Sequence, residues 1–217
     1  DAALAAFEAD DAVRAIVITG AGERAFVAGG DIADLDSRQG LAHYQEFAEV
    51  IHHLINRFDN CDKPTLGAIN GWALGGGTEL LLALDIRLVA EEAKLGLPEI
   101  TLGLFPGAGG TQRLIRQIPL CRAKELMFTG DQISAAEAVA LGMCNRTVPR
   151  ERLLDETLAA EYTERFQREA QAVGRLAHPH IVTLHDFGEE SEVTYIVMEF
   201  IRGRELAAHF EAGDYFD

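Results

Sequence analysis

Short apolar runs rich in β-branched residues recur along about the first 150 residues and alternate with stretches of helical spacing. Residues 13–19 end at Gly20-Ala21-Gly22, and residues 65–69 end at Asn70-Gly71. Runs of this kind, closed by Gly or Asn, predict buried strands followed by turns. Because strands and helices alternate through about Val148, the pattern indicates an α/β fold whose strands are partly covered by helices.

The helices are predicted from a change of period between these strands. Apolar residues at helical spacing run from Leu41 to Phe58, and a second apolar helix is expected from Thr78 to Leu84, after three glycines. A glycine-rich loop at residues 107–110 opens a further helix. Shorter strands are expected at residues 25–27, 85–90 and 94–96.

Charge and composition exclude several classes of protein. The 217 residues carry a formal net charge of −16, which repels a phosphate backbone, so nucleic acid is not an expected partner. A hydrophobic content of 48% with 25% charged residues is typical of a globular chain. No apolar run approaches the roughly 20 residues that span a bilayer, so no membrane segment is expected.

The cysteines point to a reducing environment. Cys61, Cys121 and Cys144 are far apart and form no Cys-x-x-Cys pair, which argues against a disulfide framework and against a zinc site. We therefore expect three small buried cysteines, no metal site and a cytoplasmic location. The chain opens at Asp1 without a Met or an export signal, from which we expect a fragment.

The triplet Gly75-Gly76-Gly77 is the first candidate for chemistry. At a strand-to-helix turn, glycines let the backbone approach a ligand closely, and the first N–H groups of the helix have no partner within it. Such a turn favours an anion or a developing oxyanion, although glycines also serve tight packing. Glu79 follows beside Leu80–Leu82, where a carboxylate either caps the helix or works in a pocket.

Glu99 is the second candidate. It follows Pro98, and a glutamate after proline is most often a surface turn residue. The glycine-rich loop at residues 107–110 begins a short distance further on, and beside such a loop Glu99 becomes a candidate partner carboxylate for Glu79.

Three segments resemble consecutive signatures of the enoyl-CoA hydratase (crotonase) family. They are residues 25–31 (AFVAGGD), residues 70–80 (NGWALGGGTEL) and residues 96–113 (GLPEITLGLFPGAGGTQR). Their order and spacing also match the family, and the resemblance covers approximately residues 1–160. It implies a crotonase-like core built from a repeated β-β-α unit.

The resemblance also implies how the site works. In this family two backbone amides, which match Gly30 and Gly76, form an oxyanion hole for the thioester carbonyl of an acyl-CoA and stabilise its enolate. Two glutamates, which match Glu79 and Glu99, complete the hydratase site, because hydration needs one group to activate water and one to protonate the α-carbon. We predict that Glu79 activates the water and Glu99 supplies the proton, and the reverse division stays open.

An acyl-CoA thioester is the implied substrate, and because CoA is part of it no separate cofactor is expected. The residues implied in substrate binding are Ala28, Gly30, Asp31, Ile32, Gly76 and Gly107. Relatives often carry a Lys that assists the nucleotide phosphates at the position of Ala33. This departure predicts weaker CoA binding.

The composition changes near residue 160. Residues 161–217 contain no Lys. A helix is expected over residues 161–176, where His178-Pro179 follows. A hairpin of residues 181–187 and 193–200 is expected around a loop at residues 188–192.

This second part resembles the small lobe of a bacterial Ser/Thr protein kinase over about residues 163–210. The match would supply the C helix with Glu169 and a hinge behind Met198. A kinase also needs a glycine-rich loop, an ATP-positioning Lys, a catalytic Asp and a metal-binding Asp, and the segment has none of these parts. We therefore expect no kinase activity.

We accordingly expect two parts. Residues 1–160 form a crotonase-like acyl-CoA-binding core, truncated at both ends, and residues 161–217 form a helix plus β-hairpin fragment. The leading hypothesis is an enoyl-CoA hydratase, a lyase that adds water to a 2-enoyl-CoA. The alternative is a non-catalytic or engineered chimera of a crotonase scaffold with a kinase-lobe fragment. Relatives form trimers or hexamers largely through C-terminal helices that this sequence replaces, so a homo-oligomer is left open.

The kinase-like segment generates the first prediction. Kinases bind adenine between two lobes, and residues 161–217 would offer part of one wall, so we expect no useful ATP site. Millimolar Mg-ATP should leave the melting temperature of the full chain unchanged in a thermal melt. A rise that saturates with ATP concentration would contradict the prediction.

Overall fold

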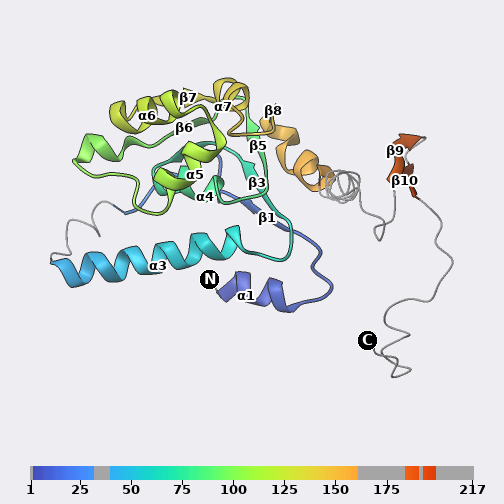
Figure 1. The fold of residues 1–217 in the computed structure, drawn as a ribbon, viewed down its shortest axis with the longest axis horizontal. Helices are drawn as coiled ribbons and strands as arrows, with labels where there is room; N and C mark the ends of the chain where they lie inside the picture. Colours follow the sequence, from blue (N-terminus) through green and yellow to red (C-terminus); the bar gives the residue numbers. More distant parts are fainter. Residues whose placement is uncertain (1, 32–39, 161–183, 191–192, 199–217) are drawn as a thin grey trace, which may run out of the picture. The chain divides into compact units, whose positions relative to one another are not determined.

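The computed structural model describes residues 2–31, 40–160, 184–190 and 193–198, with side chains for 2–31 and 45–160. The chain divides into two compact units, Asp1–Glu161 and Tyr162–Asp217, and each is described by itself. Figure 1 shows the path of the chain through the first unit, from α1 to the helical residues that follow β8.

The first unit is built on two four-stranded sheets (Figure 1). One sheet is parallel throughout and has the order β1 (Ile16–Thr19), β3 (Thr65–Ile69), β5 (Ile86–Ala90) and β8 (Arg146–Val148). The other has the order β2 (Ala25–Val27), β4 (Trp72–Leu74), β6 (Lys94–Gly96) and β7 (Gln132–Ser134), and its last pair is antiparallel.

A β-β-α unit repeats along the chain and links the two sheets. Each successive strand pair, β1–β2, β3–β4 and β5–β6, gives one strand to each sheet. These pairs are followed by α3 (Leu41–Asp59), by α4 (Gly76–Leu81), and by the 3₁₀ helix η1 (Pro98–Leu102) with α5 (Gly110–Gln117). The predicted α/β, crotonase-like repeat is thereby confirmed.

Asn70 joins the first two repeats at their turns. Its Oδ1 accepts a hydrogen bond from the Gly20 amide at 3.0 Å, and its Nδ2 donates to the Gly22 carbonyl at 2.6 Å. The Asn70 side chain is buried, so these bonds satisfy an amide that would otherwise cost free energy in the interior. The Asn-Gly turn predicted from sequence is therefore also a link between β1–β2 and β3–β4.

The core lies between the sheets and their covering helices. All five residues of β3 are buried, and Leu66, Leu88 and Leu95 have no exposed surface. Strands buried on both faces need near-continuous apolar sequence, which explains why these runs lack an alternating polar pattern. The remaining elements of this unit are α1 (Ala2–Ala9), α6 (Leu120–Thr129), α7 (Ala135–Leu141) and the 3₁₀ helix η2 (Arg150–Arg152).

Helix α3 packs on the edge of this core through a smaller apolar cluster. Ile55 of α3 is buried with Ala83 and Ala108, and Ile51 and Phe58 pack against them. Figure 1 shows α3 running along one side of the sheets with α1 beside it. This contact sets α3 against α4 and against the glycine-rich loop that precedes α5.

The structure departs from the sequence predictions in several elements. Helix α4 ends at Leu81 rather than Leu84, because Leu82–Leu84 form buried turns. Strand β4 and helix α1 were not predicted, since three residues after a turn and an alanine-rich octamer carry little periodic signal. Cys144 is buried as expected, whereas Cys61 is half-buried and Cys121 is exposed.

The second unit has a described antiparallel hairpin of β9 (Leu184–Glu190) and β10 (Val193–Met198). Tyr195 pairs with Gly188, so β9 extends through residues 188–190, for which the sequence predicts a loop. The predicted helix over residues 161–176 lies outside the described residues. Nowhere in the described ranges does a helix combine the length and the apolar character needed to cross a bilayer.

A second prediction concerns the contact between α4 and β2. A Cβ added at Gly77 would lie 1.9 Å from the Val27 carbonyl oxygen, and backbone cannot yield as a flexible side chain does. Gly77→Ala should therefore lower the free energy of unfolding by about 1–3 kcal/mol in urea titrations. Gly76→Ala is the matched control, because a Cβ there meets nothing within 4 Å. Equal midpoints for the two variants would contradict the prediction.

Candidate active site

The first turn of α4 is fixed against two strands of the second sheet. The Gly75 amide donates to the Gly96 carbonyl at 2.9 Å. The buried Thr78 hydroxyl lies 2.6 Å from the Ala73 carbonyl and 2.9 Å from the Gly96 carbonyl, and it accepts from the Gly96 amide at 3.2 Å. Together with the close approach of Gly77 to β2, these bonds hold the position from which Glu79 projects.

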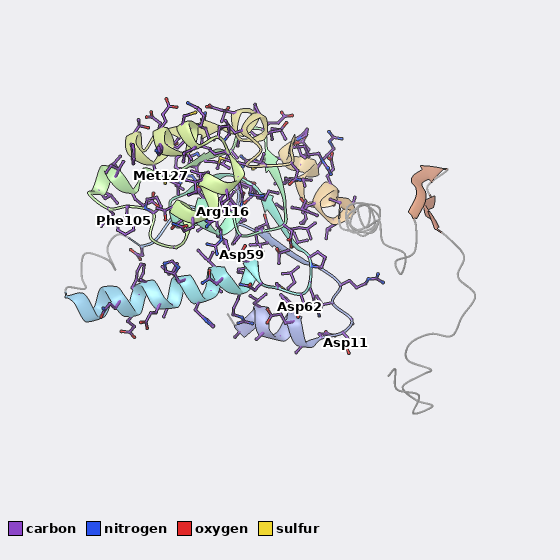
Figure 2. All side chains as sticks on the ribbon, viewed as in Figure 1. Asp11, Asp59, Asp62, Phe105, Arg116 and Met127 are labelled. Carbon is purple, nitrogen blue, oxygen red and sulfur yellow. The ribbon has the colours of Figure 1, made fainter. Side chains whose placement is uncertain are left out.

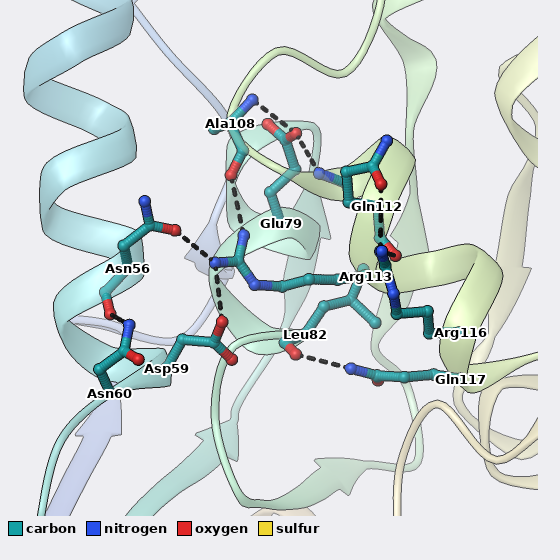
Figure 3. Close-up of polar contacts among 11 residues, drawn as sticks. Asn56, Asp59, Asn60, Glu79, Leu82, Ala108, Gln112, Arg113, Arg116 and Gln117 are labelled. Carbon is teal, nitrogen blue, oxygen red and sulfur yellow. Dashed lines mark hydrogen bonds and ion pairs between the residues drawn. The ribbon is translucent and has the colours of Figure 1, made fainter.

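Glu79 is a buried carboxylate held by two backbone amides. Its side chain is 3% exposed. Oε1 accepts a hydrogen bond from the Ala108 amide at 2.7 Å, which Figure 3 shows, and another from the Gly110 amide at 2.8 Å. Burial raises the pKa of Glu79, and the two amides oppose that rise because they favour the charged form. Both bonds reach Oε1, so Oε2 is the oxygen left for a ligand.

Glu99 faces a different environment. It lies in η1 and is half-buried, and its Oε2 is enclosed with no hydrogen-bond partner. Burial raises the pKa of Glu99 to about 7, and the negative charge of Glu79 adds to the rise. At neutral pH this carboxyl therefore carries a proton for a large part of the time.

Both carboxyl groups line one cavity of about 230 Å³. Its other lining residues come from the end of β2, the start of α4, helix α3 and the loop after η1: Gly30, Gly76, Phe47, Ala48, Ile51, Leu104, Phe105, Gly107 and Ala108. In Figure 2 the labelled Phe105 lies at the rim of the first unit, and it is 74% exposed. The apolar walls are the source of the desolvation that raises the pKa of each carboxyl.

The structure brings most of the predicted site residues together. Glu79, Glu99, Gly30, Gly76 and Gly107 all line the cavity. Gly30 reaches it because β2 ends beside α4. The roles predicted for these residues remain predictions at this point.

Three predicted binding residues stand apart from the cavity wall. Ala28 and Asp31 are exposed positions beyond the end of β2 and are not among the lining residues. Ile32 lies outside the described residues. Their part in binding therefore stays a prediction.

Sequence reasoning missed two groups of site residues. The first is the face of α3 with Phe47, Ala48 and Ile51, whose helical spacing is the same whether it meets core or cavity. The second is the pair of amides at Ala108 and Gly110 that hold Glu79. The glycine-rich loop was the available signal for that pair, since glycines free backbone N–H groups to meet a carboxylate.

No metal centre accompanies the carboxyl groups in the described part of the chain. There, no three or more His, Cys, Asp or Glu side chains gather in a group that could hold an ion.

The comparisons with known proteins agree with this fold. The family model for enoyl-CoA hydratase/isomerase matches residues 1–196. The chain is 42% identical over 154 residues to a crotonyl-CoA hydratase of Syntrophomonas wolfei, covering 71% of this chain and 59% of that protein. It is 45% identical over 161 residues to a probable enoyl-CoA hydratase of Rhizobium meliloti, covering 74% and 61%.

A solved structure gives the same result in three dimensions. The crystal structure of an enoyl-CoA hydratase from Bacillus anthracis superposes with a TM-score of 0.72 at 38% identity, covering 82% of this chain and 72% of that one. The chain belongs to the enoyl-CoA hydratase/isomerase family. It spans 59% and 61% of the length of the two curated relatives named above.

The environment of Glu99 generates a third prediction, about stability and pH. The pKa of Glu99 rises from 4.5 to about 7 on folding, so the native state holds the proton more tightly than the unfolded chain does. This contribution is fully present below pH 4.5 and is lost as the pH rises through about 7. Glu99→Gln removes the dependence, so the variant should gain stability relative to the unsubstituted chain between pH 5 and pH 8.

Thermal melts at several pH values would measure the effect. Solvent screening at a half-buried carboxyl reduces it to on the order of 1 kcal/mol, which is about 2–4 °C in melting temperature at this chain length. Glu91→Gln, at an exposed position, is the control and should show no such trend. A constant difference between Glu99→Gln and the unsubstituted chain across the range would contradict the prediction.

Proposed function

We propose that this chain carries the catalytic core of an enoyl-CoA hydratase, which adds water across the double bond of a 2-enoyl-CoA thioester. The observation that carries the proposal is a pair of carboxyl groups with different environments on one apolar cavity. Glu79 is held by two amides that favour its charged form, and Glu99 has one oxygen, Oε2, that is enclosed without a hydrogen-bond partner. Hydration requires such a pair, because one group must accept a proton while the other donates one.

Glu79 is the base in this proposal. Its Oε1 accepts hydrogen bonds from the amides of Ala108 and Gly110, which fix the carboxylate and favour its charged form against the effect of burial. Oε2 then takes a proton from a water, and the oxygen of that water bonds to the β-carbon of the substrate. The electron pair of the double bond shifts toward the thioester, whose oxygen becomes an enolate.

Glu99 is the acid. Its proton, retained near neutral pH, passes to the α-carbon as the enolate collapses, which completes the addition of one water. The pair carries one proton before and after the reaction, since Glu79 gains the proton of the water and Glu99 loses its own. Transfer of that proton from Glu79 to Glu99, directly or through solvent, restores the starting state.

The backbone amides of Gly30 and Gly76 are proposed to stabilise the enolate oxygen. Both glycines line the cavity that holds the two carboxyl groups, and Gly76 opens α4. Donors arranged before the reaction lower the barrier, because no reorganisation is needed as charge develops. Gly107 lines the same cavity, and Ala28, Asp31 and Ile32 are proposed to contact the CoA portion.

The names of the relatives support this substrate class. Besides the crotonyl-CoA hydratase, a short-chain-enoyl-CoA hydratase of Clostridium acetobutylicum is 39% identical over 155 residues. The apolar lining from α3 and the loop after η1 suits an acyl chain more than a polar group. An acyl-CoA thioester is therefore the proposed ligand, with CoA as part of the substrate.

The alternative of a non-catalytic or engineered chimera is not supported. The family match continues to residue 196 and so enters the stretch in which we predicted a kinase-like fragment. The comparisons do not show the kinase resemblance, which stays a prediction. The cytoplasmic location and the oligomeric state stay predictions too. For residues 161–217 we propose no phosphoryl transfer.

The fourth prediction tests the function itself. Loss of the conjugated thioester absorbance of crotonyl-CoA should follow addition of the chain. Glu79→Gln and Glu99→Gln should each lower kcat by roughly two to four powers of ten, the usual scale for a positioned acid or base. Glu91→Gln at its exposed position should leave the rate unchanged.

Calorimetry with saturated butyryl-CoA separates binding from chemistry. Both Gln variants should still bind it with saturable heat, because the amide has the shape of the carboxyl group. Absence of hydration by the unsubstituted chain would contradict the proposed function. An unchanged rate in either Gln variant would contradict the role proposed for that glutamate.

A further inference from the structure

Arg113 of α5 connects three separate parts of the first unit, as Figure 3 shows. Its Nη1 donates to the Ala108 carbonyl at 3.2 Å. Its Nη2 donates to Asn56 Oδ1 at 2.7 Å and to Asp59 Oδ2 at 3.1 Å, both on α3. The guanidinium therefore bridges α5, the loop before it and the C-terminal half of α3.

The loop is shaped to receive this guanidinium. Gly109 has a φ of +104°, in the left-handed region that favours glycine. A Cβ added there would lie 2.0 Å from Arg113 Nη1 and 3.1 Å from its Cζ. The Arg113 head group thus occupies the space that any side chain at position 109 would fill.

The same loop segment holds Glu79 from its other side. The Ala108 and Gly110 amides donate to Glu79 Oε1, while the Ala108 carbonyl between them accepts from Arg113. The peptide that Arg113 fixes is therefore flanked by the two donors that fix the carboxylate. Helix α3, on which Arg113 is anchored, also supplies Phe47, Ala48 and Ile51 to the cavity wall.

We propose that Arg113 is a positioning residue for the hydration reaction. By linking the residue 108–110 loop to α3, it holds the Ala108 and Gly110 amides in place to donate to Glu79. The inference rests on the proposed function for its kinetic consequence. Its structural consequence, the state of Glu79, is independent of any substrate.

The contact differs from an ordinary surface ion pair. The Arg113 side chain is 12% exposed, whereas Asp59 is 49% exposed. An exposed pair of this kind contributes little by itself, but the planar fork of Arg113 also engages a backbone carbonyl and an amide oxygen. Arg116, one turn further along α5, is exposed and donates to Gln112 on its own helix, so it serves as a matched control.

Several charged groups face Glu79, and their effects on its pKa must be distinguished from the effect of the two amides. His52 projects from α3, Arg113 from α5, and Glu99 from η1. Loss of the Arg113 charge alone would raise the pKa of Glu79. Displacement of the Ala108 and Gly110 amides from Glu79 Oε1 would raise it further. Arg113→Lys keeps the charge but loses the planar guanidinium. A change in the pKa of Glu79 in this variant therefore reports a change in the hydrogen-bond geometry of the two amides.

The fifth prediction is a titration of Glu79 by ¹³C NMR of its carboxyl carbon in the ligand-free chain. Arg113→Gln should raise the pKa of Glu79 by about one unit, and Arg113→Lys should raise it by at least half as much. Arg116→Gln should leave the titration unchanged. In the hydration assay, Arg113→Lys should lower kcat about 10–100-fold with a smaller change in KM, and move the acid limb of the rate profile to higher pH.

Asn56→Ala provides a second route that keeps Arg113 and changes no charge. Because Asn56 is exposed on α3, the variant should fold, and it should shift the Glu79 titration in the same direction by a smaller amount. A Glu79 titration that is unchanged in both Arg113→Lys and Asn56→Ala, or an Arg116→Gln shift equal to that of Arg113→Gln, would overturn the proposal. Lack of hydration by the unsubstituted chain would instead defeat the proposed function, while the titration would still decide the role of Arg113.

Discussion

The two hydrogen bonds from Ala108 and Gly110 to Glu79 Oε1 are the constraint on which the site depends. Burial raises the pKa of Glu79, which is 3% exposed, and the two donors oppose that rise because they favour the charged form. The bonds also bring the glycine-rich loop onto α4. The loop in turn carries Gly107 into the cavity and leads into α5.

The two carboxyl groups of the cavity are chemically identical but lie in different surroundings. Glu79 Oε1 accepts hydrogen bonds from two loop amides, whereas Glu99 Oε2 has no hydrogen-bond partner, although both residues line the same apolar cavity. The negative charge of Glu79 further raises the pKa of Glu99, so the pair favours one proton shared unequally over two ionised groups. This asymmetry is what an acid and a base acting on one substrate require.

Much of the fold and of the site could be predicted from particular sequence features. The strands at residues 25–27 and 65–69 were predicted with the bounds that the structure gives them, because short, mainly apolar runs closed by glycine or Asn-Gly turns carry a strong local signal. Glu79 and Glu99 were found through their neighbouring glycines and through the family resemblance. The α3 wall and the amides of Ala108 and Gly110 were not found, since their partners lie elsewhere in the chain.

The sequence by itself determined the alternation of strands and helices, the positions of the glycine turns and the presence of two glutamates near them. These properties follow from local propensity and from the chemistry of single residues. Only the tertiary structure decided that Glu79 accepts two amides, that Glu99 Oε2 has no partner and that Arg113 bridges the loop to α3. Desolvation and hydrogen-bond geometry arise when α3, α4, η1 and the residue 107–110 loop meet, and no single segment contains that information.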